Sequence, residues 1–318
     1  MMGSQPHPAS EHRARILIGP AGWSYKDWEG VVYPPGLKKK EHPAAYLAHY
    51  FDTIEINTSF YGHIRPELGK LWCHRVGEVN PIFLFTAKLH RSFTHSPQAE
   101  VESTSAATIA PSPEDEKLAK QGLDAVAGEG RLGALLIQFP FSFKNTNQNR
   151  DYLEELLARF HEYPQVIEVR HSGWNNEGIL RYFAEKGVAF CNIDQPLIGR
   201  ALKPTAYATS RLGYVRLHGR NYDQWFDSPS GADRYNYLYG EQELAGWEKK
   251  IRSVAARTDL VFVIANNHFE GKATVNALQL KHSLTGHPVP APETLVRHYP
   301  ELEKIVQPQP GPLFRTGA

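Results

Sequence analysis

Residues 132–170, LGALLIQFPFSFKNTNQNRDYLEELLARFHEYPQVIEVR, decide the fold class of this chain. The stretch opens with an apolar run at 132–139, passes through a polar loop into a segment of helical character at 150–163, and ends in a second apolar run at 166–170. A strand, a helix and another strand in this order are typical of a parallel sheet, because the helix carries the chain back to the edge where the first strand began.

The same unit repeats along the whole chain. Six further short apolar runs end in polar or aromatic residues, at 16–19, 53–57, 82–88, 188–194, 214–218 and 260–266. We expect helices at 43–51, 66–79, 114–127, 176–186, 241–257 and 272–284, and only a short or irregular segment at 199–212. Eight strands alternating with helices predict an α/β protein with a single-domain (β/α)8 TIM-barrel fold.

The two ends of the chain and two internal segments differ from this pattern. Residues 1–14 are polar and contain proline, and 307–318 read QPQPGPLFRTGA, so we expect a flexible arm and an irregular tail around a domain at 15–306. Segments 91–112 and 220–240 are unusually long for such units. Because they follow the third and seventh strands, both lie on the side of a barrel that carries active sites.

The composition of the chain argues against some classes of binding partner. The 318 residues carry a formal net charge of +1, which gives no electrostatic support for binding nucleic acid or an anionic membrane. The two cysteines have no metal-ligand spacing, and we expect both to be reduced and buried. The start lacks the apolar core of a signal peptide and no run reaches membrane-spanning length, so we expect a soluble cytoplasmic protein. The oligomeric state stays open.

Alternate residues of each strand point to opposite faces, which assigns the polar side chains. The expected inward face carries Glu55 and Asn57, Thr86, Lys88 and His90, Gln138, Glu168 and Arg170, Asn192 and Asp194, Arg216, His218 and Arg220, and Asn266 with His268. Burying this many charges costs several kcal/mol for each unpaired ion. The charges therefore pair with one another, bind a ligand or reach water.

Two interpretations of this inward face stay open. In the first, an internal salt-bridge network of Glu55 with Lys88, and of Glu168 with Arg170 or Arg216, only fills the barrel. In the second, these pairs support a ligand site. Aliphatic residues fill a barrel as well and buried pairs stabilise poorly, so we favour the ligand site.

Seven segments resemble the YecE-like family, a TIM-barrel family also described as domain of unknown function 72. They include GPAGWSYKDWEGVVYP at 19–34, TIEINTSFY at 53–61, FTAKLHRSFTH at 85–95, EVRHSGW at 168–174 and NNHFEGKATVNAL at 266–278. The resemblance implies a polar site that contains Glu55, Asn57, Lys88, His95, Gln138, Glu168, Arg170, His171, His218, Arg220, Asn266, Asn267 and His268. Ala265 departs from the family pattern, where we expect an aromatic residue. Membership implies no reaction.

The residue types suggest anion binding and acid–base chemistry. Lys88, Arg170, Arg216 and Arg220 outnumber Glu55, Glu168 and Asp194, and the planar guanidinium group binds phosphate or carboxylate through two hydrogen bonds. We expect a small anionic ligand, such as a sugar phosphate or an organic acid. Glu168 lies between apolar neighbours, so we expect a raised pKa, and His218 could carry a proton near neutrality. With Lys88, they are the predicted catalytic residues.

Aromatic side chains complete the predicted binding site. We expect Tyr61, Trp174, Trp225 and Tyr237 to stack on a sugar ring or to close over the barrel mouth. Trp23, Tyr25 and Tyr235 belong to the same aromatic group, for which packing of the loops is the alternative role.

No cofactor is predicted. A divalent metal held by Glu55, Glu168, Asp194 and His218 or His268 stays open, although no HxH or HExxH spacing supports it and the cations oppose it. No GxGxxG dinucleotide motif follows the first strand. The sequence thus favours an enzyme that acts on a small anionic or carbohydrate-like metabolite by isomerase, epimerase or lyase chemistry. The alternative is a non-catalytic protein that binds a metabolite, or docks a partner, with the same pocket.

Overall fold

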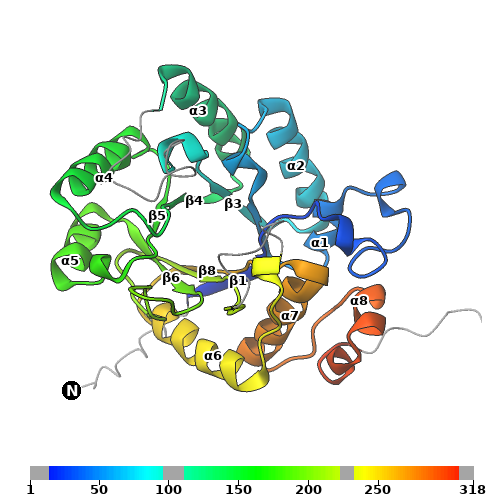
Figure 1. Ribbon diagram of the computed structural model, residues 1–318. Coiled ribbons are helices and arrows are strands. Elements are labelled where there is room, and N and C mark those ends of the chain that lie inside the picture. The colour runs from blue at the N-terminus through cyan, green and yellow to red at the C-terminus, as the bar shows by residue number, and fades with distance from the viewer. Residues whose placement is uncertain (1–13, 96–110, 223–232, 308–318) are drawn as a thin grey trace, which may run out of the picture.

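The computed structural model describes residues 14–95, 111–222 and 233–307. Eight strands form the sheet shown in Figure 1: β1 (Arg15–Pro20), β2 (Thr53–Ile56), β3 (Leu84–Lys88), β4 (Leu132–Gln138), β5 (Gln165–Glu168), β6 (Ala189–Asp194), β7 (Leu212–Leu217) and β8 (Leu260–Ala265). Every paired strand is parallel to its neighbour, in the order β1-β8-β7-β6-β5-β4-β3-β2. A parallel bridge between Ala21 and Glu55 joins the two outer strands, so the sheet is a nearly closed barrel.

Helices surround the strands (Figure 1). They are α1 (Pro43–Ala48), α2 (Pro66–Val79), α3 (Pro113–Gly128), α4 (Asn147–Arg159), α5 (Glu177–Lys186), α6 (Glu241–Ala255) and α7 (Lys272–Thr285), followed by α8 (Glu293–His298). The predicted strands, the predicted helices and the irregular segment between β6 and β7 are confirmed, and α8 was not predicted. The described residues contain no helix that is long and apolar enough to cross a membrane.

Helix starts follow local capping chemistry. Ser112 and Asp115 form a capping box at the start of α3. We expected α4 to begin at residue 150, but it begins at Asn147, because the Thr146 hydroxyl accepts a hydrogen bond from the Asn149 amide (3.2 Å). Each cap satisfies a donor that the helix itself leaves unpaired.

Aromatic side chains fill the interior of the barrel below the polar ends of the strands. The ring of Phe262 lies beside Tyr214, with their centroids 5.9 Å apart, and takes the space at Gly133, where a Cβ atom would lie 2.3 Å from the ring. Only glycine fits at that position. The barrel is therefore a packed core, and the open space lies at the carboxyl ends of its strands.

The alternation prediction is wrong for β6. Cys191 Sγ lies 3.9 Å from Glu168 Oε2, which places Cys191 on the inward face and turns Asn192 and Asp194 outward. Asn192 donates to the Tyr207 carbonyl (2.9 Å) in the segment that has no helix, and Asp194 accepts from the Trp247 indole of α6 (3.0 Å). Polar side chains face outward here because the irregular segment and the Trp247 indole need hydrogen-bond partners. An aliphatic side chain could not supply them.

Several predictions lie outside the described residues. Residues 1–13, 96–110, 223–232 and 308–318 are not described, so the flexible arm at 1–14, the tail at 307–318 and the middle parts of the two long loops stay predictions.

Candidate functional site

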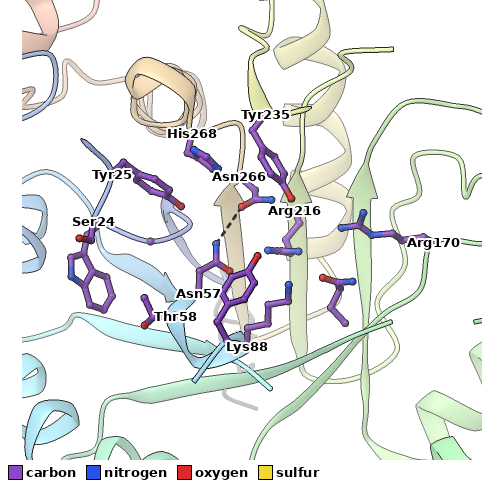
Figure 2. A pocket seen from close by; sticks show the side chains of 14 residues that line it. Ser24, Tyr25, Asn57, Thr58, Lys88, Arg170, Arg216, Tyr235, Asn266 and His268 are labelled. Carbon is purple, nitrogen blue, oxygen red and sulfur yellow. Dashed lines mark hydrogen bonds between the residues drawn. The ribbon is translucent and has the colours of Figure 1, made fainter. Parts of the chain in front are cut away.

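A cavity of about 220 Å³ opens at the carboxyl ends of the strands (Figure 2). Its walls are formed by Gly22, Trp23, Ser24, Tyr25, Asn57, Thr58, Tyr61, Lys88, Gln138, Arg170, Arg216, Tyr235, Asn266 and His268. Eight of these belong to the site predicted from the sequence: Asn57, Tyr61, Lys88, Gln138, Arg170, Arg216, Asn266 and His268. Cavities for drug-sized ligands measure roughly 300–1,000 Å³, so this one suits a smaller metabolite.

The floor of the cavity is an ion-pair network centred on Arg216. Its two terminal nitrogens each lie 2.6 Å from a carboxylate oxygen, one of Glu55 and one of Glu168. Tyr214 donates its hydroxyl to the other oxygen of Glu55 (2.9 Å). Both acids and the guanidinium group are buried. This is the internal network that the sequence allowed, except that Arg216, and not Lys88, pairs with Glu55.

The expected raised pKa of Glu168 is wrong. Burial by itself raises the pKa of this carboxyl, but Arg216, His218 and Arg170 together hold it well below its usual value. Arg170 donates to Glu168 Oε1 from Nε (3.2 Å), and His218 Nε2 contacts the same oxygen (3.1 Å). Glu168 is therefore a fixed negative charge at neutral pH, because its neighbours stabilise the ionised form.

His218 is held in its neutral form. Burial lowers its pKa to about 3, although the neighbouring Glu168 opposes the shift. The Asn266 amide donates to Nδ1 (2.9 Å), so the remaining proton lies on Nε2 and is donated to Glu168. With both ring nitrogens occupied, this imidazole orients Glu168 and Asn266. It does not titrate near neutrality, contrary to the proton-carrying role expected for it.

Lys88 differs from these groups. Its amine rises from the end of β3 into the cavity (Figure 2), and its Nζ lies 3.6 Å from the centroid of the Phe60 ring. Among the described residues it has no ion pair. Burial, and then the charge of Arg216, lower the pKa of its amine to about 7, while Glu168 and Glu55 act in the opposite direction. Lys88 is thus the cavity group that changes charge near neutral pH.

The opposite wall of the cavity is aromatic. Figure 2 shows Tyr25, His268 and Tyr235 side by side, and the His268 ring stacks on Tyr25 with centroids 4.2 Å apart and lies 4.8 Å from Tyr235. Burial lowers the pKa of His268 to about 4, so it is a neutral wall at pH 7. Two lining groups keep buried polar atoms without a hydrogen-bond partner in the described residues, namely Arg216 Nε and His268 Nδ1.

Some lining residues escaped the sequence analysis. Gly22, Ser24 and Thr58 lie just past the ends of β1 and β2, where strand alternation no longer applies. Trp23, Tyr25 and Tyr235 were recognised only as aromatic candidates. The position of GWSY directly after the first strand was the available signal, because residues that follow barrel strands line the mouth.

Arg220 and Asp194 lie outside the cavity. The Arg220 Nε atom contacts both oxygens of Asp194 (3.0 and 2.9 Å), and its Nη1 donates to Glu243 of α6 (2.7 Å). Because the carboxyl faces the helix layer, the arginine that pairs with it is drawn away from the barrel axis. The structure therefore gives no support to the prediction that these two residues bind substrate.

Five more predicted residues hold loops in place instead of lining the cavity. His171 Nδ1 accepts from the Gly173 amide (3.0 Å), and the Trp174 indole donates to the Phe143 carbonyl (2.7 Å). Asn267 donates to the Tyr237 carbonyl (2.8 Å) and Tyr237 donates to Glu243 (2.8 Å). His95 packs edge-on against Phe60, with centroids 5.0 Å apart. Trp225 lies outside the described residues.

The metal set considered from the sequence is not assembled. Arg216 bridges Glu55 and Glu168, whereas Asp194 faces α6 on the other side of the sheet. A guanidinium group between the two acids occupies the oxygens that a cation would need.

An eight-stranded parallel barrel with a polar cavity at the carboxyl ends of its strands defines a TIM-barrel protein with a small ligand-sized pocket. The chain belongs to the family described as "Protein of unknown function DUF72", whose model matches residues 17–297. This is the YecE-like family, so the resemblance seen in the sequence motifs is confirmed.

Relatives of known sequence or structure agree with this assignment. The chain is 28% identical over 275 residues to the UPF0759 protein YunF of Bacillus subtilis, covering 83% of this chain and 93% of that protein. A DUF72 family protein of Thermotoga maritima is 30% identical, with a TM-score of 0.71 over 85% of this chain and 99% of its own. A DUF72 family protein of Enterococcus faecalis, 24% identical with a TM-score of 0.71, covers 85% of this chain and 95% of its own and shares the fold.

Proposed function

We propose that this protein is an enzyme that binds a small anionic or carbohydrate-like metabolite in the cavity and moves a proton through the Lys88 amine. The observation that carries the proposal is the placement of this amine, which faces the cavity without an ion pair among the described residues. An amine whose pKa is about 7 exists in both forms at neutral pH, which suits a general acid or base.

The remaining lining residues take roles that match their chemistry. Arg170 and Arg216 place positive charge beside Lys88, which supports an anionic ligand or a negative charge that develops during proton abstraction next to a carbonyl. Asn57 and Asn266, whose amides lie 3.5 Å apart, and Gln138 are suited to orient hydroxyl groups. Tyr25, His268 and Tyr235 offer flat surfaces for a sugar ring. Glu55, Glu168 and His218 support this arrangement from below.

Solvent deuterium exchange tests the proposal without knowledge of the reaction direction. Ligands are first found with a panel of sugar phosphates and hydroxy acids, by native mass spectrometry and thermal shift. Each bound compound is then incubated with the protein in D2O. We expect the wild type to exchange a carbon-bound hydrogen, and Lys88→Gln to bind the compound but exchange it about 10²–10⁴-fold more slowly. Lys117→Gln, on the exposed face of α3, is the matched control.

One observation favours the second candidate function, a non-catalytic metabolite-binding protein. Glu168 and His218 keep fixed protonation states near neutral pH, so two of the three predicted catalytic residues cannot transfer protons there. If the wild type binds compounds of the panel and exchanges none of their hydrogens, the enzymatic proposal fails and the binding function stands. If no compound of the panel binds, both proposals fail for this ligand class.

A further inference from the structure

A second cluster of ionisable side chains lies outside the cavity, where three segments meet. His63 follows a short helical turn (Thr58–Phe60), His90 follows β3, and Asp115 lies in the first turn of α3. Asp115 Oδ1 lies 3.2 Å from His63 Nε2 and 3.9 Å from His90 Nδ1. One ligand atom of each residue lies within 4.8 Å of a ligand atom of the other two, and none of the three residues lines the cavity.

The side chains of this cluster are held by their own neighbours. Asp115 Oδ2 accepts hydrogen bonds from the Ser112 amide (3.1 Å) and hydroxyl (2.8 Å), which leaves Oδ1 facing the two imidazoles. A hydrogen bond to the backbone of Tyr61 holds His90. In metal sites, hydrogen bonds of this kind orient the ligands before the ion arrives.

We propose that His63, His90 and Asp115 form a binding site for one divalent transition-metal ion of the Zn²⁺ type. Two imidazole nitrogens and one carboxylate oxygen are donors that such ions prefer, and the fourth position is open to water. Metal–ligand distances of about 2.0–2.2 Å in a tetrahedron place neighbouring ligand atoms about 3.3 Å apart. The His63–Asp115 distance already matches this spacing. The Nδ1 atom of His90, 3.9 Å from the Asp115 oxygen, has to move closer to it by about 0.6 Å.

A simple ion pair explains only part of this arrangement. It accounts for the contact between His63 and Asp115. The second imidazole, whose ring centroid lies 4.2 Å from that of His63, is held by the Ser92 amide, which donates to its Nδ1 (3.4 Å). This cap keeps that nitrogen 3.9 Å from the same carboxylate oxygen.

Two neighbours oppose the ion. The Ser92 hydroxyl lies 2.9 Å from His90 Nδ1 and the Ser92 amide donates to the same nitrogen (3.4 Å), so the hydroxyl must rotate and the amide contact must break before that nitrogen can bind a metal. The positive charge of Arg91 also acts on His90, and it disfavours a cation as well as a proton. Both effects lower the expected affinity for the ion. Removing the Ser92 hydroxyl provides a variant that separates metal binding from a structural role.

Cobalt binding to the untagged, EDTA-treated full-length protein tests the proposal. Co²⁺ is added while visible absorption and heat are recorded, because four-coordinate Co²⁺ absorbs far more strongly than the hydrated ion. We expect one equivalent to bind and Zn²⁺ to displace it. His63→Gln and His90→Gln should each weaken binding by more than about 100-fold, the upper range for loss of a supporting hydrogen bond at a metal site.

Two control variants sharpen this result. His74→Gln removes an exposed histidine that pairs with Glu78 on α2, and should leave Co²⁺ binding unchanged. Ser92→Ala removes the competing hydroxyl and should keep or increase the affinity. The proposal is overturned if the wild type binds no Co²⁺, or if both His63→Gln and His90→Gln, folded by circular dichroism, bind it as the wild type does. None of these outcomes depends on the reaction proposed for the cavity.

Discussion

Arg216 and Lys88 are two cations of one cavity, and they are held in opposite ways. Arg216, at 1% exposure, contacts two buried carboxylates through its two terminal nitrogens. Lys88 has no carboxylate within ion-pair distance among the described residues and rests on the Phe60 ring. Both occupy inward positions at the ends of strands. The pattern of charges along the strands therefore locates the site, but only the partners of each charged group show whether that group is structural or reactive.

Removing Arg216, the cation with two carboxylate partners, should have the largest effect on stability. Arg216→Met leaves Glu55 and Glu168 buried without their shared counter-ion, and breaking a buried pair by deleting one partner costs about 3–5 kcal/mol. We expect the free energy of unfolding, measured with urea, to fall by at least this amount or the variant to be unfolded.

A surface arginine provides the matched control. Arg211 pairs with Asp259 but is 88% exposed, so Arg211→Met should change the free energy of unfolding by at most about 1 kcal/mol. A loss below 1 kcal/mol for Arg216→Met would show that the network contributes little and would contradict the contrast with Lys88.

The lowered pKa of the Lys88 amine should make the stability of the protein depend on pH. The pKa of Lys88 falls from 10.5 to about 7 on folding, so below pH 7 both states are protonated and the cost of burying the charge is fully present. Between these two values the unfolded state binds more protons, and stability rises with pH. Lys88→Met lacks this cost, so we expect its stability advantage over the wild type to shrink by about 1–3 kcal/mol between about pH 6 and about pH 9.

Urea unfolding of both proteins at several pH values measures this difference. Lys117→Met, on the exposed surface of α3, should differ from the wild type by the same amount at every pH. A Lys88→Met difference that is equally flat would mean that Lys88 keeps its charge throughout, and the amine would then be a poor base at neutral pH.

Most of the fold followed from the sequence, because each strand and helix carries its own local signal. The two strands of the β4–α4–β5 unit were placed from their apolar runs, but the helix was predicted at 150–163 and spans Asn147–Arg159. The error at its start came from an overlooked threonine cap. The short α8 was missed because it follows the last repeat of the pattern. Closure of the barrel followed from the count of eight units.

The site was harder to predict, because it depends on contacts between distant residues. Strand alternation correctly turned Glu55, Glu168 and Arg216 inward, but it failed at β6, where Asp194 binds an indole of α6. The pKa of Glu168 was predicted in the wrong direction, because its apolar neighbours in sequence are not its neighbours in space. Glu168 and Arg216 lie 48 residues apart in the sequence, so their contact could not be seen from local patterns.

The smallest expected effect separates two arginines that the sequence treated alike. Arg170 lines the cavity, whereas Arg220, at 30% exposure, binds Asp194 and Glu243 beside it. For an anionic ligand found in the panel, Arg170→Met should weaken binding by about 10-fold, equivalent to about 1.4 kcal/mol. Arg220→Met should leave the affinity unchanged and lower the free energy of unfolding by about 1–2 kcal/mol, because Arg220 is partly exposed to water and the Trp247 indole still donates to Asp194.

Calorimetric titration of both variants measures the affinities, and urea unfolding measures the stabilities. Equal losses of affinity would place Arg220 in the ligand site after all. An unchanged affinity for Arg170→Met would mean that Lys88 and Arg216 supply all the positive charge that the anion needs. Lys88, which has no carboxylate partner among the described residues, and Arg216, which has two, would then account for the positive potential of the cavity.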